Sequence, residues 1–149
     1  MKLTEKKLKE TLKKIAKILE KRPEVLAAYL YGSYAKGYAR DGSDLDIAIL
    51  TRPQFVPKSY GYQVDIDTLL NKAVPDNKVE AVVVDFMPLA LKHSAVVQGK
   101  VIYSRNDLLR AGEQIKIINN YEDMIDFYQM RLDSNIKAAK QYLLEREIL

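Results

Sequence analysis

The sequence predicts an α/β protein of the α+β type, in which a small mixed β-sheet is flanked by helices and followed by a long C-terminal helical segment. Short apolar runs of strand length alternate with helical patterns over the first two thirds of the 149 residues. From Asp107 onward, apolar residues recur at helical spacing over many turns. We therefore expect one domain over residues 1–149, with its core at about 4–105 and a helical extension at about 107–149.

The first helix is indicated by apolar residues at spacings of three and four, namely Leu8, Leu12, Ile15 and Leu19. Thr4 is expected to cap its start, and Pro23 lies just past its end. Two continuous apolar runs, residues 25–31 and 45–50, then predict buried strands, the first of which stops at Gly32. The glycines between these strands predict a short turn or helical turn and a loop.

The middle of the chain continues this alternation. Residues 62–73 predict a helix, and residues 79–84 predict a third strand. Pro88 stands at the head of another helix that runs to about Val97, and residues 100–103 follow as a short strand. These elements supply the remaining strands and covering helices of a small sheet.

The last part of the chain predicts one long helix with an apolar stripe, made of Ile117, Tyr121, Ile125, Tyr128, Leu132, Ile136, Ala139 and Leu143. Such a stripe is longer than the sheet that it covers. Two interpretations stay open: the end of the helix docks on another chain, or it folds back against the first helix.

Composition limits the classes of function. The chain has no cysteine and a single histidine, His93, so disulfides and thiolate or histidine metal clusters are excluded and any metal must bind to oxygen. A net charge of +4 and a pI near 9.1 are compatible with a phosphate-bearing ligand or RNA. Much of the positive charge lies in the first helix, where a solvated face explains it. No apolar run is long enough to cross a bilayer and no signal-peptide core is visible, which indicates a cytoplasmic protein.

Two aspartates stand at the start of the second predicted strand. Residues two apart on a strand point to the same face, so Asp44 and Asp46 present both carboxylates to one point. Such a pair of hard oxygen ligands suits a Mg²⁺ ion that also binds substrate phosphate. On its own this pair is a weak signal, because acidic residues also cap strand entrances.

A glycine and a serine at the end of the first strand strengthen the signal. Gly32 allows the backbone to approach a ligand closely, and Ser33 offers a hydroxyl and an N–H for phosphate oxygens. Together the two halves form the pattern G-S-x10-D-x-D. The spacing from Gly32 to Gly37 also fits the start of a P-loop, but Tyr38 and Ala39 stand where a P-loop needs Lys and then Ser or Thr, so that interpretation fails.

The pattern G-S-x10-D-x-D resembles the signature of the nucleotidyltransferases related to DNA polymerase beta, and the short length resembles their minimal branch. The resemblance implies the nucleotidyltransferase fold, a serine at position 33 that holds nucleotide phosphates, and Mg²⁺ bound by Asp44 and Asp46. A third carboxylate from a neighbouring strand completes the metal site in that family. The segment Val79-Glu80-Ala81-Val82-Val83-Val84 resembles that strand, which makes Glu80 the third ligand and the candidate base, with Asp85 as its competitor.

Other residues near the motif carry weaker signals. Lys36 and Arg40 lie in the intervening loop, where they either neutralise a triphosphate or face solvent. Ser43 either caps the loop or contacts phosphate, and it is the third candidate nucleotide-binding residue after Gly32 and Ser33. Tyr34 and Tyr38 either stack on a base or pack at the loop edge, and we interpret His93 as structural.

The resemblance implies transfer of AMP from ATP to an acceptor hydroxyl, with Mg²⁺ as cofactor and release of pyrophosphate. Because the core takes up nearly the whole chain, we expect a partner or a second copy to bind the acceptor. The minimal branch resembles the antitoxin half of HEPN/MNT toxin-antitoxin pairs, which implies AMPylation of a tyrosine on a partner HEPN RNase toxin, docked on the apolar stripe. The alternatives are a non-catalytic antitoxin that acts by docking alone and a dimeric nucleotidyltransferase for aminoglycoside-like small molecules. RNA is the weakest acceptor, because the basic surface lacks an aromatic platform.

Overall fold

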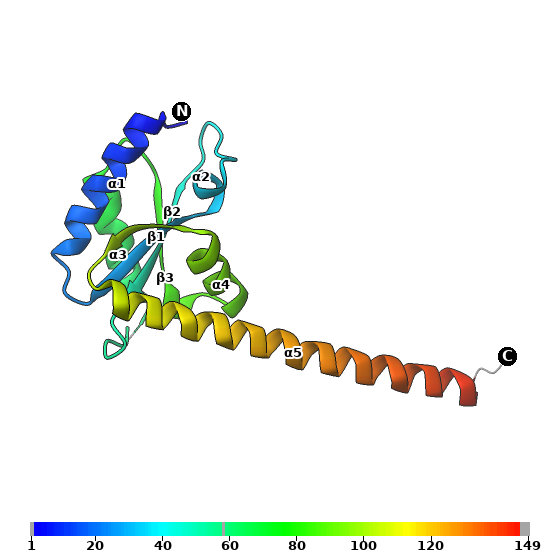
Figure 1. Cartoon of the computed structure of the whole chain (residues 1–149). Helices are drawn as coiled ribbons and strands as arrows, with labels where there is room; N and C mark the ends of the chain where they lie inside the picture. Colours follow the sequence, from blue (N-terminus) through cyan, green and yellow to red (C-terminus); the bar gives the residue numbers. More distant parts are fainter. Residues whose placement is uncertain (1, 58, 147–149) are drawn as a thin grey trace.

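The computed structural model describes residues 2–57 and 59–146. Along the chain, the elements are α1 (Glu5–Glu20), β1 (Val25–Tyr31), α2 (Gly32–Lys36), β2 (Leu45–Thr51), α3 (Tyr60–Ala73), β3 (Val79–Val83), the 3₁₀ turn η1 (Val84–Phe86), α4 (Leu89–Gln98), β4 (Lys100–Ser104) and α5 (Asp107–Arg146). The predicted α+β class is confirmed (Figure 1). The predicted helical extension is helical through Arg146, and its last positions, 147–149, lie outside the described residues.

The four strands form one mixed sheet in the order β3-β2-β1-β4. Strand β1 is central and pairs antiparallel with both β2 and β4. Strand β3 runs parallel to β2, which requires the crossover that α3 provides. The third strand ends one residue earlier than predicted, because Val84 begins the turn η1 instead of continuing the ladder.

Helices cover both faces of the sheet (Figure 1). On one face, Ile15 of α1 and Ile66 of α3 pack with Ile47 of β2 in one buried cluster. On the other face, Tyr29 of β1 and Ala48 of β2 pack with residues of η1 and α4. Neighbouring strand residues therefore point to opposite faces, as the pleat requires. The predicted N-cap of the first helix is confirmed, since Thr4 Oγ1 accepts a hydrogen bond from the Lys7 N–H.

Side chains of α3 satisfy the outer edge of β3. The N–H groups of Val79, Ala81 and Val83 donate to the side chains of Asn71, Asp67 and Gln63, at 2.8, 2.8 and 2.9 Å respectively. The three acceptors are spaced four residues apart on the helix, so each turn meets every second residue of the strand. This arrangement blocks further strand addition at the edge nearest the predicted metal site.

The first turns of α5 are anchored to the domain. Arg105 donates to the carbonyl oxygens of Val25, Glu20 and Arg22, at 2.9 to 3.0 Å, and so ties the junction before α5 to the end of α1. Inside the first turns, the buried Tyr29 hydroxyl donates to Gln114 Oε1 at 2.6 Å. These bonds fix the direction in which α5 leaves the domain.

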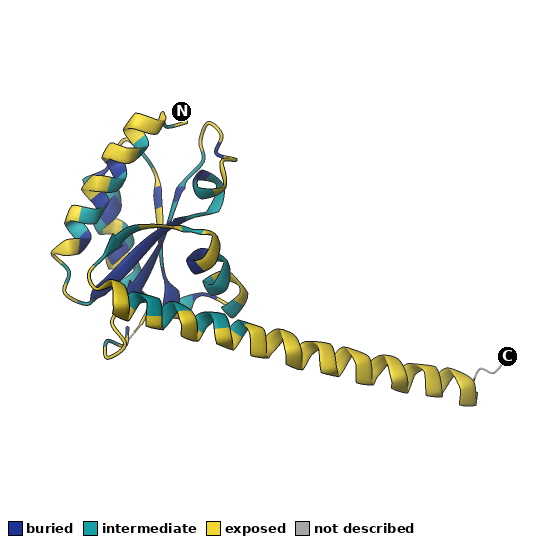
Figure 2. Cartoon of the chain, viewed as in Figure 1, coloured by how far each residue is buried: buried dark blue, intermediate teal, exposed yellow. Residues whose placement is uncertain are grey.

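The rest of α5 extends away from the domain (Figure 1). Every residue from Glu122 to Arg146 is exposed, and no residue of α5 is fully buried (Figure 2). The interpretation in which the end of this helix folds back against α1 is therefore wrong. The Arg105 anchor explains the outcome, because it directs α5 across the domain and outward from α4 instead of along α1.

Candidate active site

The register of the sheet brings the predicted site residues together. Asp46 lies between Tyr31 of β1 and Glu80 of β3, each its direct partner across the ladder. Leu45 and Ile47 of β2 pack under α1 and α3, so Asp46 alternates toward the opposite face, and Glu80 does the same on β3. The three side chains therefore share one face at the end of the sheet where α2 begins.

The backbone conformation and the close contact with Asp46 require glycine at position 32. Its φ angle is +72°, in the left-handed region, and a Cβ at this position would overlap with Asp46 Oδ2. Only glycine satisfies both conditions without strain. Ser33 then occupies the first turn of the short helix α2, so the glycine-serine pair lies beside the carboxylates.

Asp44 lies just before β2, and its neighbouring contacts are with the residue that precedes β3. Its Oδ2 lies 3.7 Å from Lys78 Nζ, the residue that immediately precedes β3, and the Leu45 N–H donates to the Lys78 carbonyl oxygen. The lysine side chain is largely exposed, so this ion pair contributes little to stability. It places a cation beside the carboxylates.

The carboxylates of Asp44, Asp46 and Glu80 are close enough to interact electrostatically. Burial and the nearby charges of Glu80 and Asp44 raise the pKa of Asp46 to about 6. Burial, together with the charges of Asp46 and Glu80, also raises the pKa of the Tyr31 phenol to about 12. A bound cation relieves repulsion of this kind.

The three carboxylates are adjacent without forming a closed cage. Over residues 2–57 and 59–146, no three acidic or histidine side chains lie close enough together to hold a metal ion as they stand. The donor set still fits Mg²⁺, because all three groups are hard oxygen ligands, they repel one another, and the backbone at Gly32 leaves room for Asp46. Mg²⁺ usually keeps several waters and binds through few protein carboxylates.

Asp85, the competitor for the third carboxylate, lies elsewhere. It is exposed in the turn η1, after the far end of β3. From Glu80 the strand runs on for three residues, or about 10 Å, before the turn that contains Asp85 begins. The structure therefore brings Glu80, and not Asp85, next to Asp46.

The weaker candidates separate into loop and packing residues. Ser43 Oγ accepts a hydrogen bond from the Arg40 N–H at 2.8 Å, which is the loop-capping alternative. Tyr34 is buried and its hydroxyl accepts from the Leu3 N–H, whereas Tyr38 is 72% exposed. Lys36 and Arg40 are exposed, as a solvent-facing role requires.

His93 lies away from the carboxylates. Its ring stacks on that of Tyr121 at a centroid distance of 4.0 Å, between α4 and α5. This packing is the structural role that the sequence predicts.

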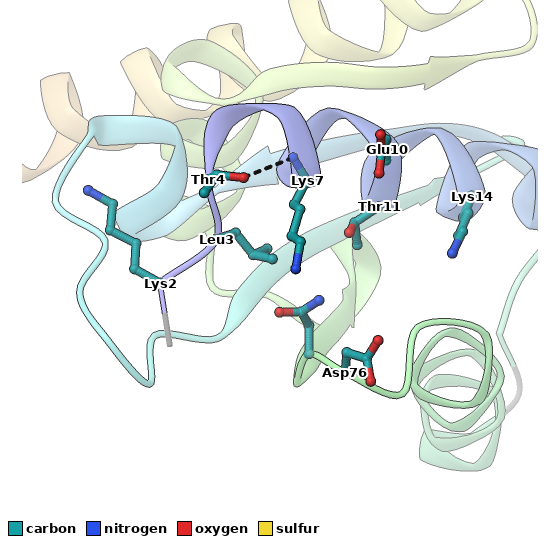
Figure 3. Close-up of a pocket in the computed structure, with 9 residues that line it drawn as sticks. Lys2, Leu3, Thr4, Lys7, Glu10, Thr11, Lys14 and Asp76 are labelled. Carbon is teal, nitrogen blue, oxygen red and sulfur yellow. Dashed lines mark hydrogen bonds between the residues drawn. The ribbon is translucent and has the colours of Figure 1, made fainter.

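Neither of two surface hollows contains the whole site, and one of them includes Glu80. One, of about 310 Å³, is lined mainly by α1 residues and by the loop before β3. Figure 3 shows Lys7 and Lys14 pointing from α1 toward the loop that carries Asp76. This hollow is on the α1 side of the sheet, so its lysines do not face Asp46. The second, of about 210 Å³, lies between α3 and β3 and includes Glu80 in its wall.

Sequence reasoning missed Tyr31 and Lys78 as neighbours of the carboxylates. The pairing of Tyr31 with Asp46 depends on the register of β1 against β2, which includes an irregularity between Val25 and Ala27. Lys78 is placed by the crossover to β3, and a lysine before a strand gives no signal on its own.

Comparisons with known proteins agree with this geometry. A family model described as "Polymerase beta, Nucleotidyltransferase" matches residues 13–108. None of the curated proteins matches the sequence. Within the described residues, no helix has the length and apolar character needed to cross a membrane.

Several solved structures with a similar fold are toxin-antitoxin complexes. A toxin-antitoxin structure with AMP-PNP matches with a TM-score of 0.66 and 25% identity over 84% of this chain and 98% of that one. A tri-AMPylated HEPN toxin in complex with its MNT antitoxin, from Shewanella oneidensis, matches with a TM-score of 0.63 and 24% identity over 85% and 96%. A MntA–HepT toxin-antitoxin structure matches with a TM-score of 0.62 and 23% identity over 85% and 97%.

Proposed function

The chain belongs to the polymerase beta nucleotidyltransferase family, and from that premise we propose that it transfers AMP from ATP, with Mg²⁺, to a tyrosine hydroxyl of a partner HEPN toxin. The observation that carries the proposal is the register that sets Asp46 beside Glu80, with Gly32 pressed against Asp46. The reaction belongs in the cytoplasm, where ATP and Mg²⁺ are abundant.

Each residue of the site has a role in this reaction. Asp44, Asp46 and Glu80 would hold Mg²⁺, which when bound neutralises the triphosphate and lowers the pKa of the acceptor hydroxyl. The backbone at Gly32 and the hydroxyl of Ser33 bind phosphate oxygens at the start of α2. Ser43 holds the loop so that Asp44 keeps its place, and the assignment of Ser43 as a direct nucleotide ligand remains a prediction.

The transfer itself needs a base and a leaving group. The acceptor oxygen forms a bond to the α-phosphorus of ATP, and the bond from that phosphorus to the bridging oxygen of the β-phosphate breaks. Pyrophosphate leaves with the electron pair, and the hydroxyl proton passes to Glu80, the most exposed of the three carboxylates. AMP is then joined to the acceptor through a phosphodiester.

The structural neighbours support a protein acceptor. One contains AMP-PNP, a non-hydrolysable ATP analogue, and another contains a HEPN toxin that is tri-AMPylated. This chain shares their fold over most of its length. A HEPN protein encoded beside this chain is therefore the first acceptor to test.

The experiment is a transfer assay with ATP labelled at the α-phosphate, Mg²⁺ and that HEPN protein. We expect label on the HEPN protein, lost with EDTA and with Asp44→Asn, and retained with Asp85→Asn as the matched control. A stable complex without label would favour the docking antitoxin. Label on an aminoglycoside-like compound, and none on the protein, would favour the small-molecule enzyme.

A further inference from the structure

The distal segment of α5, residues 122–146, lacks an intramolecular partner within the part of the chain that the structure describes. Its large apolar side chains are exposed, including Tyr128 at 70% and Ile136 at 46% (Figure 2). A helix of this length with an exposed apolar stripe is stabilised by packing against something else.

Four large aliphatic residues of the apolar stripe are arranged symmetrically about Ser134. Leu132 and Ile136 lie two residues on either side of it, and Ile125 and Leu143 lie nine residues on either side. When two copies of this segment run antiparallel and cross at Ser134, each of these residues faces its counterpart across the pair.

Charges along the segment show the same complementarity. Residues 122–133 carry four acidic side chains and one basic one, whereas residues 134–146 carry three basic side chains and one acidic one. In an antiparallel pair the acidic half of one copy lies beside the basic half of the other. A parallel pair would place like charges together.

The charged side chains on one flank of the stripe show the same complementarity between individual residues. At about 100° per residue, Asp126, Asp133, Lys137 and Lys140 all lie on one side of the stripe. In an antiparallel pair, this flank of one helix meets the same flank of the other. With the crossing at Ser134, Asp126 lies two residues, or about 3 Å along the axis, from the level of Lys140 of the partner subunit. Asp133 lies at the same offset from Lys137 and from Asp133 of the partner subunit.

We propose that α5 pairs antiparallel with α5 of a second copy of this chain, through residues 122–146. The contact spans about seven helical turns, or about 37 Å. A hollow on the surface of the segment, lined by Phe127, Tyr128, Arg131, Leu132 and Asn135, lies along the other flank of the stripe.

The pairing leaves the active sites apart and open. Asp107, the first residue of α5, lies 27 residues before Ser134, which is about 40 Å from the crossing point. The two domains therefore lie at opposite ends of the helix pair, and neither covers the carboxylates of the other. The inference does not rest on the proposed function.

The test is sedimentation equilibrium of the full chain over a concentration series. We expect a reversible dimer, and we expect Leu132→Asp with Ile136→Asp to make it monomeric. Ser134→Asp with Gln141→Asp, on the opposite side of the helix, is the matched control and keeps the dimer. Circular dichroism checks that the helix is retained in each variant.

A charge exchange identifies the partner. The double variant Asp126→Lys with Asp133→Lys, and separately Lys137→Asp with Lys140→Asp, should each weaken self-association by at least about tenfold, because like charges then face each other. An equimolar mixture of the two variants should restore a dimer, since one flank is then fully basic and the other fully acidic. No other occupant of the segment predicts this rescue.

Three results would overturn the proposal. The first is a wild-type chain that stays monomeric at every concentration. The second is a pair of charge variants that associate as the wild type does. The third is an equimolar mixture of the two variants that does not recover a dimer. A monomer whose stripe is needed to bind the HEPN protein would assign this surface to the toxin instead.

Discussion

The two ends of the molecule differ in what determines their conformation. At the active-site end, Asp46 is held between two paired strands and pressed against Gly32, in contact with a buried core. At the other end, residues 122–146 of α5 are exposed on every side. The chain therefore determines the site by itself, whereas the surface of the distal helix is completed by another molecule. Variants at each end of the molecule test this difference.

Removing the carboxylates should abolish catalysis and leave the fold intact. Asp44→Asn combined with Asp46→Asn removes two of the three charges that would hold Mg²⁺, and we expect AMP transfer to fall by about a thousandfold or more. Transfer to the HEPN protein is measured with labelled ATP, and thermal unfolding shows that the domain remains folded. Turnover near the wild-type rate would refute the assignment of these residues.

Two glycines with the same backbone conformation should give different results. Gly32 and Gly37 have φ angles of +72° and +79°, so alanine at either position costs about 1–2 kcal/mol of stability. A Cβ at position 32 would overlap with Asp46, whereas a Cβ at position 37 would have nothing within 4 Å. We expect both variants to lower Tm, and Gly32→Ala alone to remove activity beyond its loss of folded protein. Equal activity in the two folded variants would contradict the close approach at Gly32.

The stability of the metal-free protein should depend on the charge of Asp46. Its pKa is raised in the folded state, to about 6, so its protonation stabilises the fold below the unfolded pKa of about 4, and this contribution is lost as the pH rises through 6. Because the side chain is only half-buried, we expect a loss of about 1 kcal/mol. Asp46→Asn should therefore be more stable than the wild type in EDTA at pH 8, by denaturant unfolding.

The comparison at low pH is the control for this prediction. Well below pH 4, both folded and unfolded chains carry a protonated Asp46, and the stability gain of Asp46→Asn should disappear. A gain of the same size at both pH values would mean that charge is not its cause.

Deleting the distal helix should have the smallest effect on the domain. A chain that ends at Tyr121 keeps the Tyr29–Gln114 hydrogen bond and the stacking of His93 on Tyr121, so we expect its free energy of unfolding, measured in dilute solution, to change by less than about 0.5 kcal/mol. Gln114→Ala, which leaves the buried Tyr29 hydroxyl without its acceptor, should cost about 1–3 kcal/mol. A larger loss from the deletion than from Gln114→Ala would show that the distal segment stabilises the domain.

Local patterns in the sequence predict most of the fold and the central part of the site. The apolar runs at 25–31 and 45–50 became β1 and β2 with bounds within a residue, because continuous apolar stretches bounded by glycine or proline have few alternatives. The family resemblance made Glu80 the third carboxylate and left Asp85 as its competitor, and the structure places Glu80 beside Asp46.

What the sequence left undetermined depends on long-range geometry. The direction of α5 is set by Arg105, which binds carbonyl oxygens some eighty residues away, and no local pattern marks that contact. The same holds for Tyr31 and Lys78, which approach the carboxylates only through register and crossover. Local signals therefore predicted the elements, and tertiary contacts determined how they meet.

The most direct test of the proposed function is the intact mass of the HEPN protein encoded beside this chain, after incubation with it, ATP and Mg²⁺. We expect a gain of one or more AMP units, mapped to tyrosine, that is absent with Asp46→Asn and present with Asp85→Asn. An unchanged mass with the wild-type chain, or an AMP unit that persists with Asp46→Asn, would contradict it.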